Sequence, residues 1–178
     1  MRLFSLFLSA VLTATASATP VISEFMASNA TTLKDGHGNY EDWVEVWNPG
    51  AVAVDLAGWR LTDATSVPDK FVFPSRMLPP GGRLVVICSG RVGANGAVHV
   101  DPDGYVHAPF SLAKGGEYLA LITPDGASRT TEFSPAYPPQ VTDLSYGTQA
   151  QNETLVNETT AVRYFVPTNA TPDTAATN

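Results

Sequence analysis

The stretch Asp42-Trp43-Val44-Glu45-Val46-Trp47-Asn48-Pro49-Gly50 decides the fold class of this chain. Apolar and polar residues alternate in it with a period of two, which is typical of a β-strand with one buried face. Asn48-Pro49-Gly50 then predicts a turn, because proline fixes φ and glycine accepts a positive φ. The side chains divide between two faces, with Val44 and Val46 on one and Trp43, Glu45 and Trp47 on the other.

Further short apolar runs follow one another along the chain, separated by Pro, Gly and Asp turn signals, and they predict more strands. No segment has a helical period long enough to predict a helix. This pattern is typical of an all-β sandwich or barrel. The predicted strands are 21–27, 42–48, 58–63, 70–73, 83–88, 117–123 and 129–133.

The alternation also predicts the core. We expect Leu78 to close one end of the fold ahead of the turn Pro79-Pro80-Gly81-Gly82. The side chains expected inside are Val44, Val46, Leu56, Trp59, Leu61, Phe71, Phe73, Leu84, Val86, Leu119, Leu121 and Phe133.

The chain has 178 residues, a formal net charge of −7 and only 15% charged residues. This length suffices for one domain with a proper core. Nucleic-acid binding needs clustered Lys and Arg, and no such patch occurs in this acidic chain. We therefore expect no nucleic-acid partner.

Composition divides the chain into three parts. Residues 1–18 predict a secretory signal peptide, with Arg2, an apolar run too short to span a bilayer, and Ala16-Ser17-Ala18 before the expected cut. Residues 19–147 form the predicted domain, and residues 148–178 predict a Thr- and Asn-rich linker. The strand-like run 162–166 is either a tail segment docked on the sandwich or the start of a further module. We expect a secreted or cell-surface protein with no transmembrane span after cleavage.

Cys88 is the single cysteine, so no intramolecular disulfide can form. It lies in an apolar run and is expected to be a small buried hydrophobe. An exported protein without disulfides fits a bacterial envelope better than an animal extracellular fluid. A catalytic cysteine would need a base nearby. His37, His99 and His107 are dispersed in the sequence, and none lies in a recognisable Cys–His context.

Several segments in order resemble one family, the lamin tail domain, and in particular its bacterial secreted relatives. After the opening strand 21–27, the stretch from Asp42 to Gly50 resembles the family's motif of an acid, a Trp, a Glu in a strand and an Asn in a turn. Leu56-Ala57-Gly58-Trp59-Arg60-Leu61 resembles the element that follows it. The resemblance continues through 71–74, 78–82, 110–112, 116–121 and 125–126 to 138–140 and 143–147.

This resemblance implies an immunoglobulin-like β-sandwich, in agreement with the predicted strands. It also implies a non-catalytic module without cofactors, which contacts another protein or a cell-surface polysaccharide or spaces a neighbouring domain. No heptads precede the domain, so the nuclear location of animal lamins does not follow. Two alternatives stay open: an accessory carbohydrate-binding module, and the N-terminal part of a larger secreted or surface enzyme.

The loop Asp35-Gly36-His37-Gly38-Asn39-Tyr40-Glu41-Asp42 gathers oxygen ligands before the second strand. Calcium prefers such oxygens, which makes Asp35, Asn39 and Asp42 a candidate calcium site. The spacing is not that of an EF-hand. The alternative is a solvated loop in which Asp42 accepts a hydrogen bond from a nearby backbone N–H.

Asp42 and Glu45 are three residues apart on one strand, so they point to opposite faces and predict no pair for glycoside hydrolysis. We expect no enzymatic activity from this chain. Trp43, Glu45 and Trp47 remain the candidate binding residues, either exposed to a sugar or protein partner or packed in part against a second sheet. Asn48 is expected to stabilise its turn rather than bind a ligand.

Overall fold

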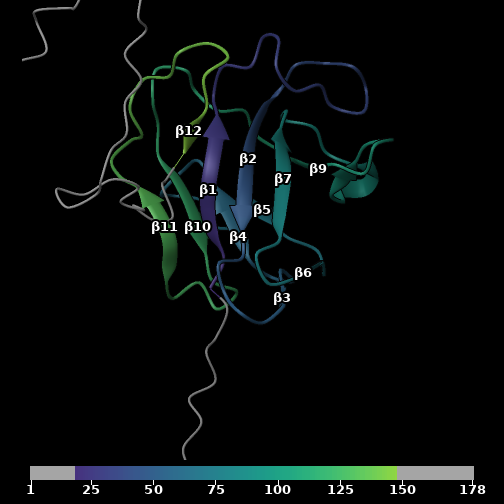
Figure 1. Ribbon diagram of the computed structural model, residues 1–178, viewed down its shortest axis with the longest axis vertical. Coiled ribbons are helices and arrows are strands. Elements are labelled where there is room, and N and C mark those ends of the chain that lie inside the picture. The colour runs from purple at the N-terminus through teal and green to yellow at the C-terminus, as the bar shows by residue number, and fades with distance from the viewer. Residues whose placement is uncertain (1–18, 148–178) are drawn as a thin grey trace, which may run out of the picture.

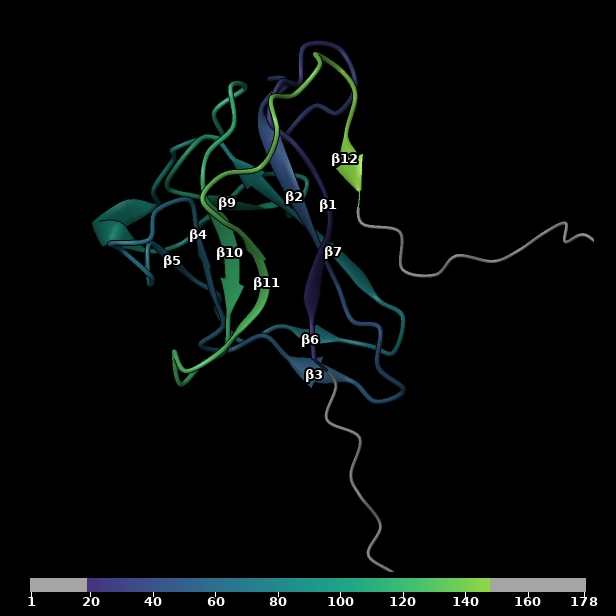
Figure 2. The same cartoon turned by 90° about the vertical axis from the view of Figure 1, so that its left-hand side faces the viewer.

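The structure, a computed structural model, describes residues 19–147. Two β-sheets face each other across one core, and this part of the chain contains no α-helix, only the short 3-10 turn η1 (Ala94–Gly96). Figure 1 shows the strands, and Figure 2 shows β1, β2 and β7 on one side of the sandwich with β4, β10 and β11 on the other. The predicted all-β, immunoglobulin-like class is confirmed.

The larger sheet has six strands. All neighbours are antiparallel except β7 and β9, which run parallel. Its spatial order is β12 (Tyr146–Gly147), β1 (Val21–Met26), β2 (Asp42–Trp47), β7 (Arg83–Cys88), β9 (Val106–Ala108) and β8 (His99–Val100).

The second sheet has four antiparallel strands, and a separate two-stranded sheet closes one end of the sandwich (Figure 2). The order of the four is β11 (Arg129–Phe133), β10 (Leu119–Ile122), β4 (Arg60–Thr62) and β5 (Phe71–Val72). The pair consists of β3 (Val54–Asp55) and β6 (Met77–Leu78), where the buried Leu78 fills the end of the core as predicted.

The core lies between the facing sheets. Of the twelve predicted core residues, all are buried except Phe133, which packs against the core while partly exposed. A β-bulge in β1 explains how both Ile22 and Phe25 enter the core. Ile22 pairs with Val46 and Phe25 with Val44, so two residues of β1 lie opposite Glu45.

The predicted strands all occur, most of them shorter by one or two residues at their ends. The sequence missed β3, β6, β8, β9 and β12, each of only two or three residues. Strands this short show too few alternations to be recognised from their period. The expected signal peptide, linker and strand-like run 162–166 lie outside the described residues.

Asn48 stabilises the turn after β2, as predicted. It is fully buried, and its Nδ2 donates to the carbonyl oxygens of Val52, Leu78 and Pro79 at 2.8, 3.1 and 3.0 Å. Its Oδ1 accepts from the N–H of Gly50 at 3.0 Å. Within residues 19–147, no helix has the length and apolar character that crossing a membrane requires.

Candidate functional site

The outer surface of the large sheet carries the three predicted binding residues. Trp43, Glu45 and Trp47 are all half-buried, because β1 and β7 flank β2 on either side. Glu45 forms an ion pair with Arg83 and accepts a hydrogen bond from Ser23 Oγ at 2.5 Å. The Arg83 guanidinium also lies over the Trp47 ring, 5.0 Å from its centroid. We call this surface the tryptophan face.

Strand register extends the same outer surface toward the far edge of the sheet. Trp43 pairs with Ile87 of β7, Ile87 pairs with His107 of β9, and His107 pairs with His99 of β8. Val106 and Ala108, the neighbours of His107 in sequence, point into the core. His107 therefore faces outward beside His99.

The loop between β1 and β2, residues 27–41, lies beyond the upper ends of these strands in Figure 1 and contacts the β8–β9 hairpin at Asp101 and His99. A bridge between Lys34 and Tyr40 closes its tip. Inside the tip, Asp35 Oδ1 accepts the N–H groups of His37 and Asn39 at 3.0 and 2.8 Å. The loop thus presents Asp35 and His37 to β8 and β9.

All three histidines of the chain meet here. The ring centroids of His99 and His107 are 4.8 Å apart, and those of His37 and His99 are 5.3 Å apart. The Nε2 atoms of His37 and His99 lie 3.0 Å from each other. The three residues are dispersed in the sequence, and the short strands β8 and β9 and the β1–β2 loop bring them into contact.

Asp101, in the turn between β8 and β9, joins this cluster. Its Oδ2 lies 3.2 Å from His107 Nε2 and accepts the N–H of Gly36 at 2.6 Å. Its Oδ1 accepts the N–H groups of Asp103 and Tyr105. Burial alone would raise the pKa of Asp101, but the hydrogen bonds from Gly36, His107 and Tyr105 outweigh it and lower the pKa to about 2.

The pKa values of Asp35 and His99 are also lowered. Burial raises the pKa of Asp35, and the N–H donors of Asn39 and His37 more than reverse this, so that the pKa is lowered. Partial burial lowers the pKa of His99, and repulsion from His107 and His37 adds to the effect. The carboxylates are therefore ionised at neutral pH, and the His99 ring favours its neutral form.

The structure keeps together two of the three residues of the calcium hypothesis. Asp35 is buried, lies with Asp101 and His107, and accepts the N–H of Asn39, which is exposed on the loop. Asp42 does not belong to that group, and its Oδ2 accepts the N–H of Leu112 at 3.1 Å. This backbone contact matches the alternative proposed for Asp42, although its donor is distant in sequence rather than local. Calcium binding itself stays a prediction.

Sequence signals for the missed residues existed. His99 and His107 lie at equal distances from Asp103, and Asp103-Gly104 is a turn signal. Interpreting residues 102–104 as a three-residue hairpin loop with Gly104 at its left-handed position would have paired the two histidines. No sequence signal of this kind predicts the positions of Asp35 and His37, because both lie in an irregular loop of fifteen residues.

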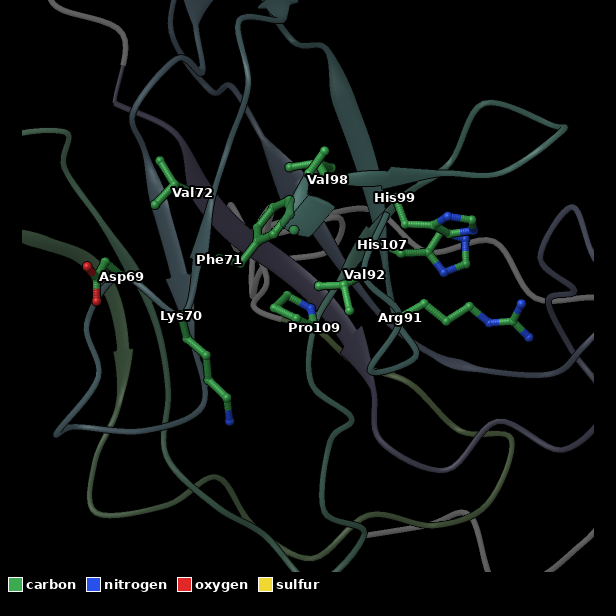
Figure 3. Close-up of a pocket in the computed structure, with 12 residues that line it drawn as sticks. Asp69, Lys70, Phe71, Val72, Arg91, Val92, Val98, His99, His107 and Pro109 are labelled. Carbon is green, nitrogen blue, oxygen red and sulfur yellow. The ribbon is translucent and has the colours of Figure 1, made fainter. Parts of the chain in front are cut away.

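A cavity of about 250 Å³ adjoins the histidine cluster, because His99 and His107 are among the residues that line it. Figure 3 shows Phe71, Val92, Val98 and Pro109 around it, with Lys70 at one end. The His99, His107 and Arg91 side chains lie together at the other end of it. The histidine cluster therefore forms part of the wall of this cavity.

Cys88 is fully buried, and burial raises the pKa of its thiol well above the usual value. It points into the core, as predicted for a small hydrophobe. Its thiol is thus held protonated and away from the tryptophan face and the histidine cluster.

The two facing sheets with one shared core form an immunoglobulin-like sandwich. The model of the lamin tail domain family matches residues 13–135, more than half of the chain, and the chain belongs to this family. The family is generally a non-catalytic interaction module. No curated protein and no solved structure matches the chain.

Proposed function

We propose that this domain is an interaction or spacer module of an exported bacterial protein and that it contacts a protein partner through the tryptophan face. The observation that carries the proposal is the position of Trp43 and Trp47 on the outer surface of a sheet whose other surface already supplies the core. Indole rings there contribute little to the core of the domain itself. Trp and Arg are also the residues most enriched at the energetic centres of protein interfaces.

The contacts of Trp47 favour a protein over a polysaccharide. A sugar stacks on an open aromatic face, but the Arg83 guanidinium covers one side of this ring. Because Glu45 neutralises Arg83, the pair adds little net charge to the surface. A locally neutral surface with aromatic and guanidinium groups is typical of a protein interface.

Site-specific photo-crosslinking tests this proposal. A photoreactive phenylalanine replaces Val85, which pairs with Glu45 on the same surface, and in a control it replaces the exposed Val72 of the opposite sheet. We expect a specific crosslinked protein from the cell envelope with the first probe and not with the second. The purified partner should then bind Trp47→Ala at least about tenfold more weakly than the wild type.

Equal crosslinking from both positions, or unchanged affinity of the Trp47→Ala variant, would contradict the proposed surface. A glycan array distinguishes a protein-binding module from a carbohydrate-binding one. Retention on a cell-wall glycan that is lost in Trp47→Ala would favour the carbohydrate-binding module. Export is tested by mass spectrometry of the secreted protein. A mature N-terminus at Thr19 is expected from the signal peptide.

A further inference from the structure

We propose that Asp35, Asp101 and His107 bind one divalent transition-metal ion, with zinc as the expected species. The three residues come from the β1–β2 loop, the β8–β9 turn and β9. One ligand atom from each lies within 4.8 Å of the others, and all three side chains are at least nine-tenths buried. The site lies two strands away from Trp43 on the same outer surface, and it does not depend on the function proposed for the tryptophan residues.

An unpartnered atom in the group points to a ligand. Asp35 is only 3% exposed, and its Oδ2 is buried without a hydrogen-bond partner, whereas its Oδ1 accepts two backbone N–H groups. A buried carboxylate oxygen without a partner carries a desolvation cost that native proteins rarely accept. A cation bound between Asp35 and Asp101 removes that cost, because it replaces the lost water.

The spacing of the donors suits a small ion. Zinc binds His nitrogen and carboxylate oxygen at about 2.0–2.2 Å, so two donors of a tetrahedral site lie roughly 3.3 Å apart. His107 Nε2 and Asp101 Oδ2 are 3.2 Å apart. Both atoms can therefore contact one ion with little movement of either side chain.

Hydrogen bonds to their other polar atoms fix the orientation of His107 and Asp101. His107 Nδ1 lies 2.7 Å from Ser89 Oγ, which fixes the ring and leaves Nε2 directed toward Asp101. The N–H groups of Asp103 and Tyr105 hold the other oxygen of Asp101. Such supporting hydrogen bonds are the usual surroundings of metal ligands, because they orient each donor and set its protonation.

A hydrogen-bond network without a metal ion does not account for the unpartnered oxygen of Asp35. Nε2 of His107 can donate one proton, and Asp101 Oδ2 is the acceptor within reach. This leaves the second carboxylate, that of Asp35, with an unsatisfied oxygen beside the first. A divalent ion satisfies both carboxylates and the imidazole at once.

The donor set favours zinc over calcium. Calcium requires six to eight oxygen ligands, whereas the buried group supplies two carboxylates and one imidazole nitrogen. Imidazole is a preferred ligand of zinc and its neighbours in the first transition row. The His37 and His99 rings adjoin His107 but are not part of the group whose ligand atoms lie within 4.8 Å of one another.

Isothermal titration with Zn²⁺ tests the proposal on the full chain, produced without a histidine tag and freed of metal with a chelator. We expect one ion per chain, a rise in melting temperature of several degrees, and weaker binding of Ca²⁺ than of Zn²⁺. Titration with Co²⁺ should give the visible absorption of a low-symmetry site with nitrogen and oxygen ligands. Absence of Zn²⁺ binding at millimolar concentration would overturn the proposal.

Asp35→Asn is the decisive variant, since it keeps the side-chain volume and the Oδ1 acceptor but removes the negative ligand. We expect Zn²⁺ affinity to fall by more than about 100-fold, while the metal-free variant melts at or above the wild-type temperature. Unchanged Zn²⁺ affinity together with a lower metal-free melting temperature would assign Asp35 a purely structural role and overturn the proposal.

The double variant His37→Ala/His99→Ala controls for binding by the more exposed ring pair. We expect it to bind Zn²⁺ more tightly than Asp35→Asn does. If the double variant loses binding while Asp35→Asn retains it, the ion sits on the outer rings and the proposed ligands are wrong.

Discussion

At the scale of single residues, Asn48 is the side chain with the largest predicted structural role. Replacement by Ala leaves the Gly50 N–H and the carbonyl oxygens of Val52, Leu78 and Pro79 without their partner. Unsatisfied buried polar groups are costly, so we expect Asn48→Ala to lower the free energy of unfolding by about 3 kcal/mol. Urea denaturation followed by tryptophan fluorescence measures this loss.

Two variants make the Asn48 prediction specific. Asn48→Asp keeps the acceptor but sets a carboxylate against three carbonyl oxygens, so it should be at least as destabilising as the alanine. Ser66→Ala changes an exposed residue and should stay within about 0.5 kcal/mol of the wild type. Stability of Asn48→Ala equal to that of Ser66→Ala would show that the turn does not depend on this amide.

At the scale of elements, contact between the β1–β2 loop and the β8–β9 turn depends on the absence of a side chain at Gly36. A Cβ there would lie 2.7 Å from Asp103 N and 2.8 Å from Asp101 Cγ. Since both neighbours are fixed by hydrogen bonds, Gly36→Ala must lift the loop. We expect a loss of about 1–3 kcal/mol, measured by urea denaturation, and faster amide exchange at residues 34–40.

Gly115→Ala is the matched control, because a Cβ at Gly115 meets nothing within 4 Å. It should leave both stability and loop exchange unchanged. Normal protection of residues 34–40 in Gly36→Ala would contradict the close approach of the loop and the turn. The same exchange experiment thus tests how Asp35 reaches Asp101.

The long strands were predictable from the sequence, whereas the cluster of histidines was not. The difference lies in how each element is positioned. In β2, six residues alternate against a core, so the period reveals both the strand and its buried face, and β7 is recognisable as a continuous apolar run. β8 has two residues, and its position comes from pairing with β9, which in turn rests on β7. The site thus depends on long-range pairing, whereas the tryptophan face depends on local alternation within β2.

At the scale of the whole molecule, the carboxylates of Asp55 and Asp143 accept hydrogen bonds that join segments distant in sequence. Asp143 Oδ1 accepts the N–H groups of Ala30 and Thr31, which connects the closing segment to the β1–β2 loop. Asp55 of β3 accepts the N–H of Arg76, and Ser75 donates its hydroxyl to the same carboxylate. Together they hold the two ends of the sandwich.

These contacts predict loss of stability in acid. The N–H donors at Ala30 and Ala57, respectively, are the largest cause that lowers the pKa of Asp143 and of Asp55. Because each folded pKa lies below the unfolded value of about 3.9, the unfolded chain binds these protons more tightly. The stabilisation is therefore complete above about pH 4 and is lost as the pH falls through the folded pKa values.

Urea denaturation at pH 6, 4 and 3 in a chelating buffer measures this loss, and it should be smaller in Asp55→Asn and Asp143→Asn than in the wild type. Asparagine keeps the acceptor oxygen but has no proton to gain, so each variant removes one titrating group while retaining its N–H contacts. Asp69→Asn is the control, since Asp69 is exposed and accepts no hydrogen bond from the described part of the chain. If all three variants lose as much stability as the wild type between pH 6 and pH 3, the acid sensitivity arises elsewhere, and the two carboxylates do not hold the ends of the sandwich through their charge.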